Sequence, residues 1–66
     1  RRYEEAIPQF ETAIQRGATA NEFFYELGLS YAFLSQCDKA IAWLDRALQA
    51  EPDSVPAKQG KALCGQ

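Results

Sequence analysis

The 66-residue sequence contains no histidine and no methionine, and it has only two cysteines, Cys37 and Cys64. Without histidine the chain has no imidazole that could act as a general base or bind a metal ion. The cysteines have neither the paired spacing of zinc ligands nor the C-x-x-C spacing of a redox motif, and no activating group is evident for either. We therefore expect no metal, no cofactor and no catalytic residue in this chain.

We interpret Cys37 and Cys64 as two separate free thiols, in preference to the single disulfide that two cysteines would also allow. Free thiols are more typical of a reducing compartment, so the sequence leans weakly toward a cytoplasmic location without fixing it. A domain of this size buries only about 60% of the surface that its unfolded chain exposes, so its core is predicted to be marginal.

The sequence is also poor in basic clusters and in long apolar runs. The net charge is -2, and all nine acidic residues lie between residues 3 and 53, where only Arg16, Lys39 and Arg46 are basic. Nucleic-acid binding needs Lys and Arg gathered on one face, and a membrane span needs about 20 apolar residues in succession. The sequence therefore predicts neither nucleic-acid binding nor membrane insertion.

What the sequence does contain is apolar residues at helical spacing in successive blocks. The first block covers residues 3–16. Its helical periodicity begins without an initiating methionine or a capping residue, so we expect the sequence to be an excerpt of a longer protein. A catalytic domain could lie elsewhere in that protein. Further helices are predicted over residues 21–34, from the polar break at residues 35–38 to about residue 50, and over residues 55–66. Gly17 is expected to end the first helix, Thr19-x-x-Glu22 to form a capping box, and Ser54 to cap the last helix.

The second predicted helix is apolar on two sides, which indicates either burial between neighbours or a face reserved for a partner. One side carries Phe24, Leu27, Gly28 and Tyr31. The other carries Tyr25, Leu29, Ala32 and Phe33. In the third helix Ala40, Leu44 and Ala47 continue the apolar stripe, and small residues at Gly28 and Ala40 predict a close helix crossing. Trp43, off that stripe, is expected to pack against the last helix.

An internal repeat appears when the chain is shifted by 34 residues, because Ala6, Ile7 and Phe10 then align with Ala40, Ile41 and Leu44. The period and the central pattern resemble the tetratricopeptide repeat, whose signature is W-x2-L-G-x2-Y, A-x3-F and P. The matching residues here are Phe24, Leu27, Gly28, Tyr31, Ala40, Leu44, Ala47 and Pro52, with Phe24 in place of the tryptophan and Leu44 in place of the phenylalanine.

The resemblance implies an all-α fold of antiparallel helix-turn-helix repeats in a short, right-handed superhelical α-solenoid. Residues 1–20 would be the second helix of a preceding repeat, residues 21–54 one complete repeat, and residues 55–66 a partial repeat or a capping helix. In the last segment the match fails, since Lys58, Lys61 and Gly65 stand where Phe24, Leu27 and Tyr31 stood one repeat earlier.

The resemblance also implies a function, namely a protein–protein interaction scaffold that binds a peptide or partner helix on the concave face. The groove-facing residues would be Glu22, Tyr25, Glu26, Leu29, Ala32 and Phe33. Some family members clamp a C-terminal carboxylate with Lys and Asn, but Tyr25 and Leu29 stand at those positions, so an apolar ligand, with or without basic residues, is expected instead. The alternative is a structural or self-associating segment of a longer superhelix, in which the same residues pack against this protein.

Overall fold

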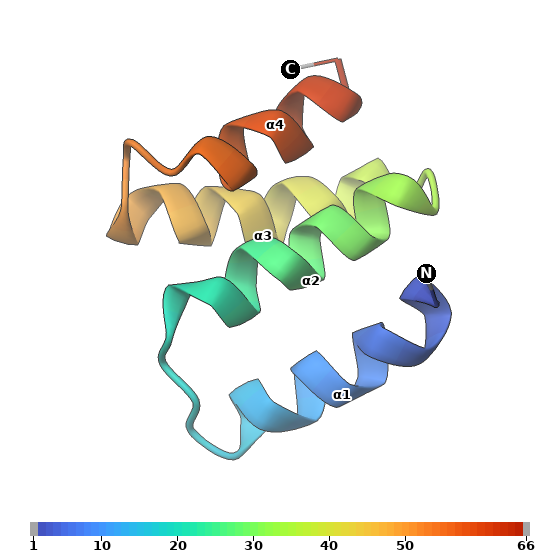
Figure 1. Cartoon of the computed structure of the whole chain (residues 1–66), viewed down its shortest axis with the longest axis vertical. Coiled ribbons are helices and arrows are strands. Elements are labelled where there is room, and N and C mark those ends of the chain that lie inside the picture. Colours follow the sequence, from blue (N-terminus) through green and yellow to red (C-terminus); the bar gives the residue numbers. More distant parts are fainter. Residues whose placement is uncertain (1, 66) are drawn as a thin grey trace.

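The computed structural model describes residues 2–65, which form four α-helices joined by short turns (Figure 1). The helices are α1 (Tyr3–Gln15), α2 (Asn21–Phe33), α3 (Cys37–Ala50) and α4 (Val55–Leu63). Residues 2–65 contain no strand, so the prediction of an all-α fold is confirmed. No helix within this part of the chain has the length and apolar character needed to cross a bilayer.

The helix ends follow the sequence signals in two places and depart from them in one. Gly17 has a φ of +96° and ends α1 in the left-handed conformation, as predicted. Ser54 caps α4, because its Oγ accepts a hydrogen bond from the backbone N–H of Ala57 at 3.4 Å. The predicted capping box at Thr19 is wrong, since α2 begins one residue too late for it, with Ala20 at the N-cap position and no side-chain cap.

Asn21 makes the contact that fixes the start of α2. Its Nδ2 donates to the backbone oxygen of Ala47 at 3.2 Å and to Oε1 of Glu51 at 2.8 Å. Both acceptors lie at the end of α3, so this amide ties the first turn of α2 to the last turn of α3.

The hairpin of α2 and α3 is the centre of the molecule, with α1 on one side and α4 on the other (Figure 1). Helix α2 contacts all three other helices, and α4 contacts α3 as well as α2. A helix that packs against three neighbours needs apolar residues around most of its surface. This arrangement accounts for the two apolar sides of residues 21–34.

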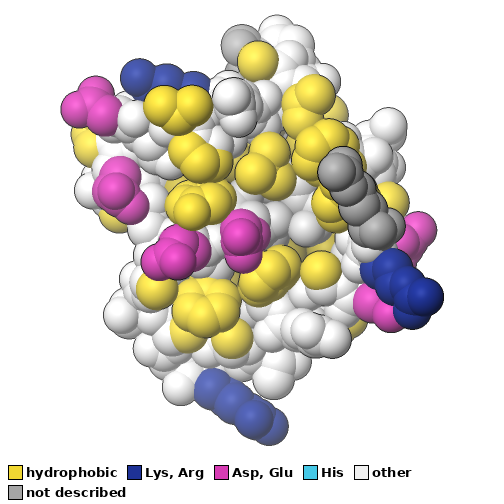
Figure 2. Space-filling view, in the orientation of Figure 1, with side chains coloured by type: hydrophobic (Ala, Val, Ile, Leu, Met, Phe, Trp, Pro, Cys, Tyr) yellow, Lys and Arg dark blue, Asp and Glu magenta, His cyan; other side chains and the backbone are white. Residues whose placement is uncertain are grey.

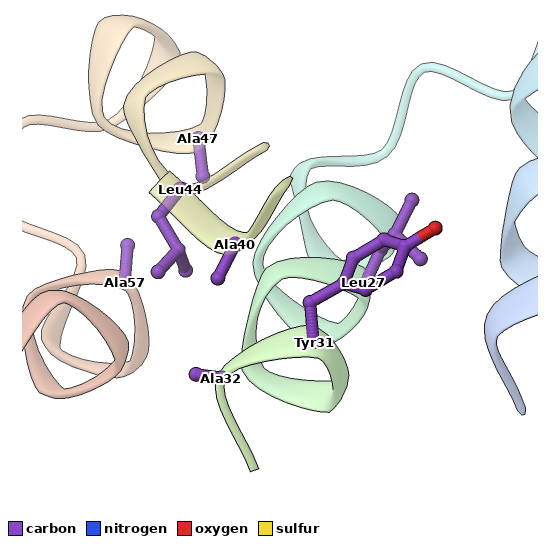
Figure 3. Packing of buried hydrophobic residues seen from close by; sticks show 7 residues of the cluster. All are labelled: Leu27, Tyr31, Ala32, Ala40, Leu44, Ala47 and Ala57. Carbon is purple, nitrogen blue, oxygen red and sulfur yellow. The ribbon is translucent and has the colours of Figure 1, made fainter. Parts of the chain in front are cut away.

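The core lies where α2, α3 and α4 meet, and Leu27 and Leu44 are its largest fully buried side chains (Figure 3). A Cβ added at Gly28 would lie 2.6 Å from both Cγ and Cδ2 of Leu44 and 3.2 Å from the backbone oxygen of Ala40. The predicted close crossing of the two helices is therefore confirmed. The whole buried apolar cluster consists of Leu27, Tyr31, Ala32, Ala40, Leu44, Ala47 and Ala57.

Helix α1 docks on α2 through large side chains and one strong hydrogen bond. Ile7, Phe10 and Ile14 are partly buried against the core. The Tyr31 hydroxyl of α2 donates to Oε2 of Glu11 at 2.6 Å. This bond, with burial and the negative charge of Glu11, raises the pKa of Tyr31 from 10.0 to about 12. Glu11 is thus part of the contact between the two helices.

Cys37 and Cys64 form a disulfide, so the prediction of two free thiols is wrong. The two residues are 27 positions apart in the sequence, but the packing of α4 against α3 brings the first residue of α3 to the C-cap of α4. Their Cα atoms lie 5.6 Å apart, within the usual range for a disulfide. The weak lean toward a cytoplasmic location, which depended on free thiols, loses its basis.

Helix α4 is held by small side chains rather than by an apolar stripe. Its buried residues are Ala57 and Gly60. A Cβ on Gly60 would lie 2.8 Å from Cδ1 and 2.9 Å from Cδ2 of Leu44, so this glycine allows α4 to approach the hairpin closely. Lys61 adds an ion pair to Asp45 of α3, with Nζ and Oδ1 2.7 Å apart.

Candidate functional site

Two hollows run along α2 and are separated by a ridge made of Leu29 and Phe33, which line both of them. The first hollow, of about 310 Å³, lies between α1 and α2; the second, of about 430 Å³, lies between α2 and α4. The first is lined by Arg2, Tyr3, Ala6, Phe10, Glu26, Leu29, Ser30 and Phe33. The second is lined by Leu29, Phe33, Gln59, Ala62 and Leu63. We call this surface the α2 groove.

The α2 groove is mainly apolar with acidic side chains among the apolar ones. Figure 2 shows hydrophobic side chains gathered on the face that carries α2 and on the flanking parts of α1 and α4, with Asp or Glu side chains between them. Glu26 is exposed and lines the first hollow, and Glu22 is exposed one turn before it in α2. The groove therefore combines apolar contact area with negative charge near the start of α2.

Phe33 is the most prominent apolar residue of the ridge, since about half of it, 50%, is exposed. Its ring stacks on Tyr3 of α1, with ring centroids 4.8 Å apart and an angle of 16° between the planes. This contact covers one face of the ring, while half of the residue stays accessible. A rigidly held aromatic ring offers a large contact area at a small cost in conformational entropy.

Tyr25 lies outside both hollows and is half-buried against the core. Burial raises the pKa of the Tyr25 hydroxyl, and the negative charges of Glu22, Glu26 and Glu51 raise it further. The Tyr25 hydroxyl thus lies in an acidic environment.

Ala32 is 8% exposed and belongs to the core cluster with Ala57 of α4. Figure 3 shows its methyl group directed toward α4. Of the six residues predicted for the groove, the structure therefore brings Glu26, Leu29 and Phe33 together in it. It places Glu22 and Tyr25 toward the start of α2, and it buries Ala32 beneath the last helix.

Several residues that line the groove were not singled out by sequence reasoning. Tyr3 and Phe10 lie on α1, and part of each side chain lines the first hollow. Leu63 repeats Leu29 at the 34-residue period, which was the available signal for its place in the second hollow.

The side chains that line the groove are mainly apolar, with Glu26 as the acidic one. Within residues 2–65, no group of three or more His, Cys, Asp and Glu side chains is placed to hold a metal ion. No family model matches the chain, and neither a curated protein nor a solved structure matches it.

Proposed function

We propose that this chain is a protein–protein interaction scaffold of the tetratricopeptide-repeat type, in which the α2 groove binds a peptide or partner helix. The observation that carries the proposal is the apolar ridge of Leu29 and Phe33 between two hollows, with Glu26 at its edge. A half-exposed ring held by a stacked neighbour is the kind of anchor on which peptide recognition commonly depends.

The positions of the helices support the repeat assignment. Tyr3 and Cys37 begin α1 and α3 and are 34 residues apart, as are Asn21 and Val55, which begin α2 and α4. On this assignment α1 is the second helix of one repeat, α2 and α3 form a complete repeat over residues 21–54, and α4 opens the next. The contacts of α2 with α1, α3 and α4 agree with a stack of such hairpins in a short α-solenoid.

The ligand proposed for the groove is an apolar peptide with basic residues. Leu29, Phe33 and Leu63 provide apolar contact area, and Glu22 and Glu26 favour a positively charged side chain beside it. We propose no catalytic role for these residues. The two cysteines, which are the strongest nucleophiles in the sequence, are joined to each other.

The test uses a short fluorescent peptide with leucines one helical turn apart and lysines between them, and its binding is followed by fluorescence anisotropy. Phe33→Ala is expected to weaken binding about tenfold or more, as for an anchor residue. Val55→Ala is the matched control, because Val55 is 60% exposed and lies outside both hollows. Its binding should equal that of the unchanged protein.

Two further peptides define what the groove recognises. Replacing the lysines by glutamates should weaken binding through repulsion from Glu22 and Glu26, and replacing the leucines by serines should abolish it. If all three peptides bind equally, or if Val55→Ala weakens binding as much as Phe33→Ala, the groove is not the binding site.

The alternative role, self-association within a longer superhelix, is favoured by one observation. Val55 of α4 is 60% exposed and lies outside both hollows, so the last helix carries apolar surface beyond the groove. Measurement of the molecular mass in solution separates the two roles. A scaffold that binds peptides remains monomeric without its ligand, whereas a self-associating segment increases in mass with concentration and loses that increase in Val55→Ser.

A further inference from the structure

We propose that the Cys37–Cys64 disulfide is a cleavable redox site, and that its reduction by a dithiol releases α4 and so removes one wall of the α2 groove. The part of this inference that concerns ligand binding rests on the proposed function. The part that concerns the release of α4 is independent of it.

The first observation is that α4 has few non-covalent anchors. Its buried residues are Ala57 and Gly60, while its larger apolar residues Val55 and Leu63 are 60% and 53% exposed. Small buried groups remove little apolar surface from water, so they provide little of the hydrophobic free energy that docks a helix.

The remaining contacts of α4 are weak as well. The ion pair between Lys61 and Asp45 is partly exposed, with 28% and 49% of the two side chains accessible, so water and salt screen it. The helix has nine residues with Gly60 inside it, and a helix of that length is not stable alone in water. The disulfide, at the C-cap of α4, is therefore the contact that most restricts this end of the helix.

The second observation is where α4 lies. Gln59, Ala62 and Leu63 form the α4 side of the second hollow, opposite Leu29 and Phe33 of α2. If α4 separates from the hairpin, that hollow no longer exists. The first hollow is lined by α1, α2 and Arg2 and would remain.

The reaction is an ordinary thiol–disulfide exchange with a dithiol reductant. A thiolate of the reductant attacks Sγ of Cys37, the Cys37–Cys64 bond breaks, and its electron pair passes to Sγ of Cys64, which takes up a proton. The second thiol of the reductant then attacks the mixed disulfide and releases Cys37. The reductant becomes a disulfide, the protein gains two thiols, and two electrons are transferred.

The surroundings of the bond leave it open to such a reagent. Both cysteines are only partly buried. Cys37 borders a hollow of about 300 Å³ that is lined otherwise by Ser35, Gln36, Asp38 and Lys39 of the turn between α2 and α3.

The experiment compares the oxidised 66-residue chain with the same chain reduced by dithiothreitol, using amide hydrogen exchange followed by NMR. Reduction is expected to accelerate exchange in α4, residues 57–63, by about tenfold or more. The amides of Leu27 and Leu44 in the hairpin are expected to keep most of their protection. Alkylation of both cysteines, measured by mass, verifies that the bond has been reduced.

Two results would overturn the inference. One is equal protection of α4 in the oxidised and reduced chains. The other is loss of protection in all four helices together, which would make the disulfide a support of the whole fold rather than of α4. The doubly substituted chain, Cys37→Ser with Cys64→Ser, is the control, because its exchange should match the reduced form and should not respond to dithiothreitol. If this variant fails to fold, the comparison of oxidised with reduced unchanged protein still decides the question.

Binding of the basic apolar peptide is then measured in both redox states. Reduction is expected to weaken binding about fivefold or more, since the α4 wall of the second hollow is lost. If the peptide binds neither form while α4 is still released, the proposed function fails and the redox inference stands. If the peptide binds both forms equally while α4 is released, the second hollow is not part of the binding site and the regulatory part of the inference fails.

Discussion

Helices α1 and α4 cover opposite sides of the same hairpin, yet they are attached to it by different means (Figure 1). Helix α1 docks through Ile7, Phe10 and Ile14 and through the hydrogen bond from Tyr31 to Glu11. Helix α4 docks through the close approach of Ala57 and Gly60, an exposed ion pair and a disulfide. An apolar stripe in a sequence therefore predicts docking through large side chains, as in α1, but it does not predict docking through small residues and a disulfide, as in α4.

The largest effect is expected at Leu44, because this fully buried side chain touches both the hairpin crossing and α4. Leu44→Ala should lower the free energy of unfolding by about 2 to 5 kcal/mol, as for other buried leucines. Urea unfolding followed by circular dichroism measures it. Leu63→Ala removes the same atoms from a side chain that is 53% exposed and should cost about 0.5 kcal/mol or less. Equal costs would mean that Leu44 is not the shared centre of the two interfaces.

The second prediction concerns the close approach of α4. In Gly60→Ala the new Cβ would meet both Leu44 methyl groups below 3.0 Å and Cδ2 of Leu29 at 3.3 Å. Overpacking costs about 1 to 3 kcal/mol, and the better helix preference of alanine returns about 1 kcal/mol, so we expect a net loss of about 1 kcal/mol. Thermal unfolding measures the loss, and Gln59→Ala, a substitution of an exposed neighbour in the same helix, is the control. A more stable Gly60→Ala variant would show that α4 is not closely packed.

The third prediction concerns the hydrogen bond between Tyr31 and Glu11, whose contribution to stability should depend on pH. Because the pKa of Tyr31 is raised from 10.0 to about 12 in the folded state, the stability that its hydroxyl contributes is fully present below about pH 10. That contribution is lost as the pH rises from about 10 to about 12. We expect it to be about 1 to 2 kcal/mol.

Tyr31→Phe removes this contribution, so the variant should be less stable than the unchanged protein at pH 7 and the difference should shrink above pH 10. Urea unfolding at a series of pH values measures it. Tyr3→Phe, which keeps the ring that stacks on Phe33, serves as the control and should show the same pH profile as the unchanged protein. A difference that stays constant with pH would show that the Glu11 hydrogen bond does not stabilise the fold.

The smallest effect is expected for the ion pair of α4. Lys61→Met should lower the free energy of unfolding by about 0.2 to 1 kcal/mol at low salt and by less at high salt, since the pair is partly exposed. A double-mutant cycle with Asp45→Asn isolates the interaction. A coupling energy well above this range would mean that the ion pair, and not the disulfide, is the main anchor of α4.

The first three helices could be predicted from the sequence because each repeats its apolar residues at helical spacing. The last helix, which has few apolar residues, could be predicted from its Ser54 cap. The hairpin crossing could be predicted because Gly28 and Ala40 are small where their neighbours are large. Small residues at such positions are typical of two helices that approach closely. Gly17 and Ser54 were predicted as caps for equally local reasons. The helices and their caps depend on residues within one or two turns of each other, and the crossing joins two consecutive helices.

The features that could not be predicted depend on residues far apart in the chain. The pairing of Cys37 with Cys64 requires the position of α4 on α3, which no spacing within the sequence encodes. The hydrogen bond between Tyr31 and Glu11 and the role of Gly60 also depend on how the helices pack. From the sequence alone, Gly60 only lowers the helix preference of its segment. Trp43, expected against the last helix, stacks on Phe24 of α2 with ring centroids 6.1 Å apart.

In the candidate groove, too, some residues could be predicted from the sequence of one helix and others could not. Leu29 and Phe33 were predicted because they extend the apolar surface of α2 beyond the stripe that packs on α3. Ala32 was placed with them by helical spacing alone, but α4 covers the turn on which it lies. The walls of the groove, such as Tyr3 and Leu63, come from other helices and could be assigned only after these helices were placed in space.

The disulfide also closes residues 37–64 into a covalent ring that contains α3, the connecting segment and α4. Glu51, Pro52 and Asp53 of that segment are exposed, which makes the segment accessible to a protease. A single cut there would divide the main chain but leave its two pieces joined through Cys37 and Cys64. The cut molecule would retain the mass of both pieces and separate only when a reductant is added, so the ring would keep α4 with the hairpin even after the connecting backbone is lost.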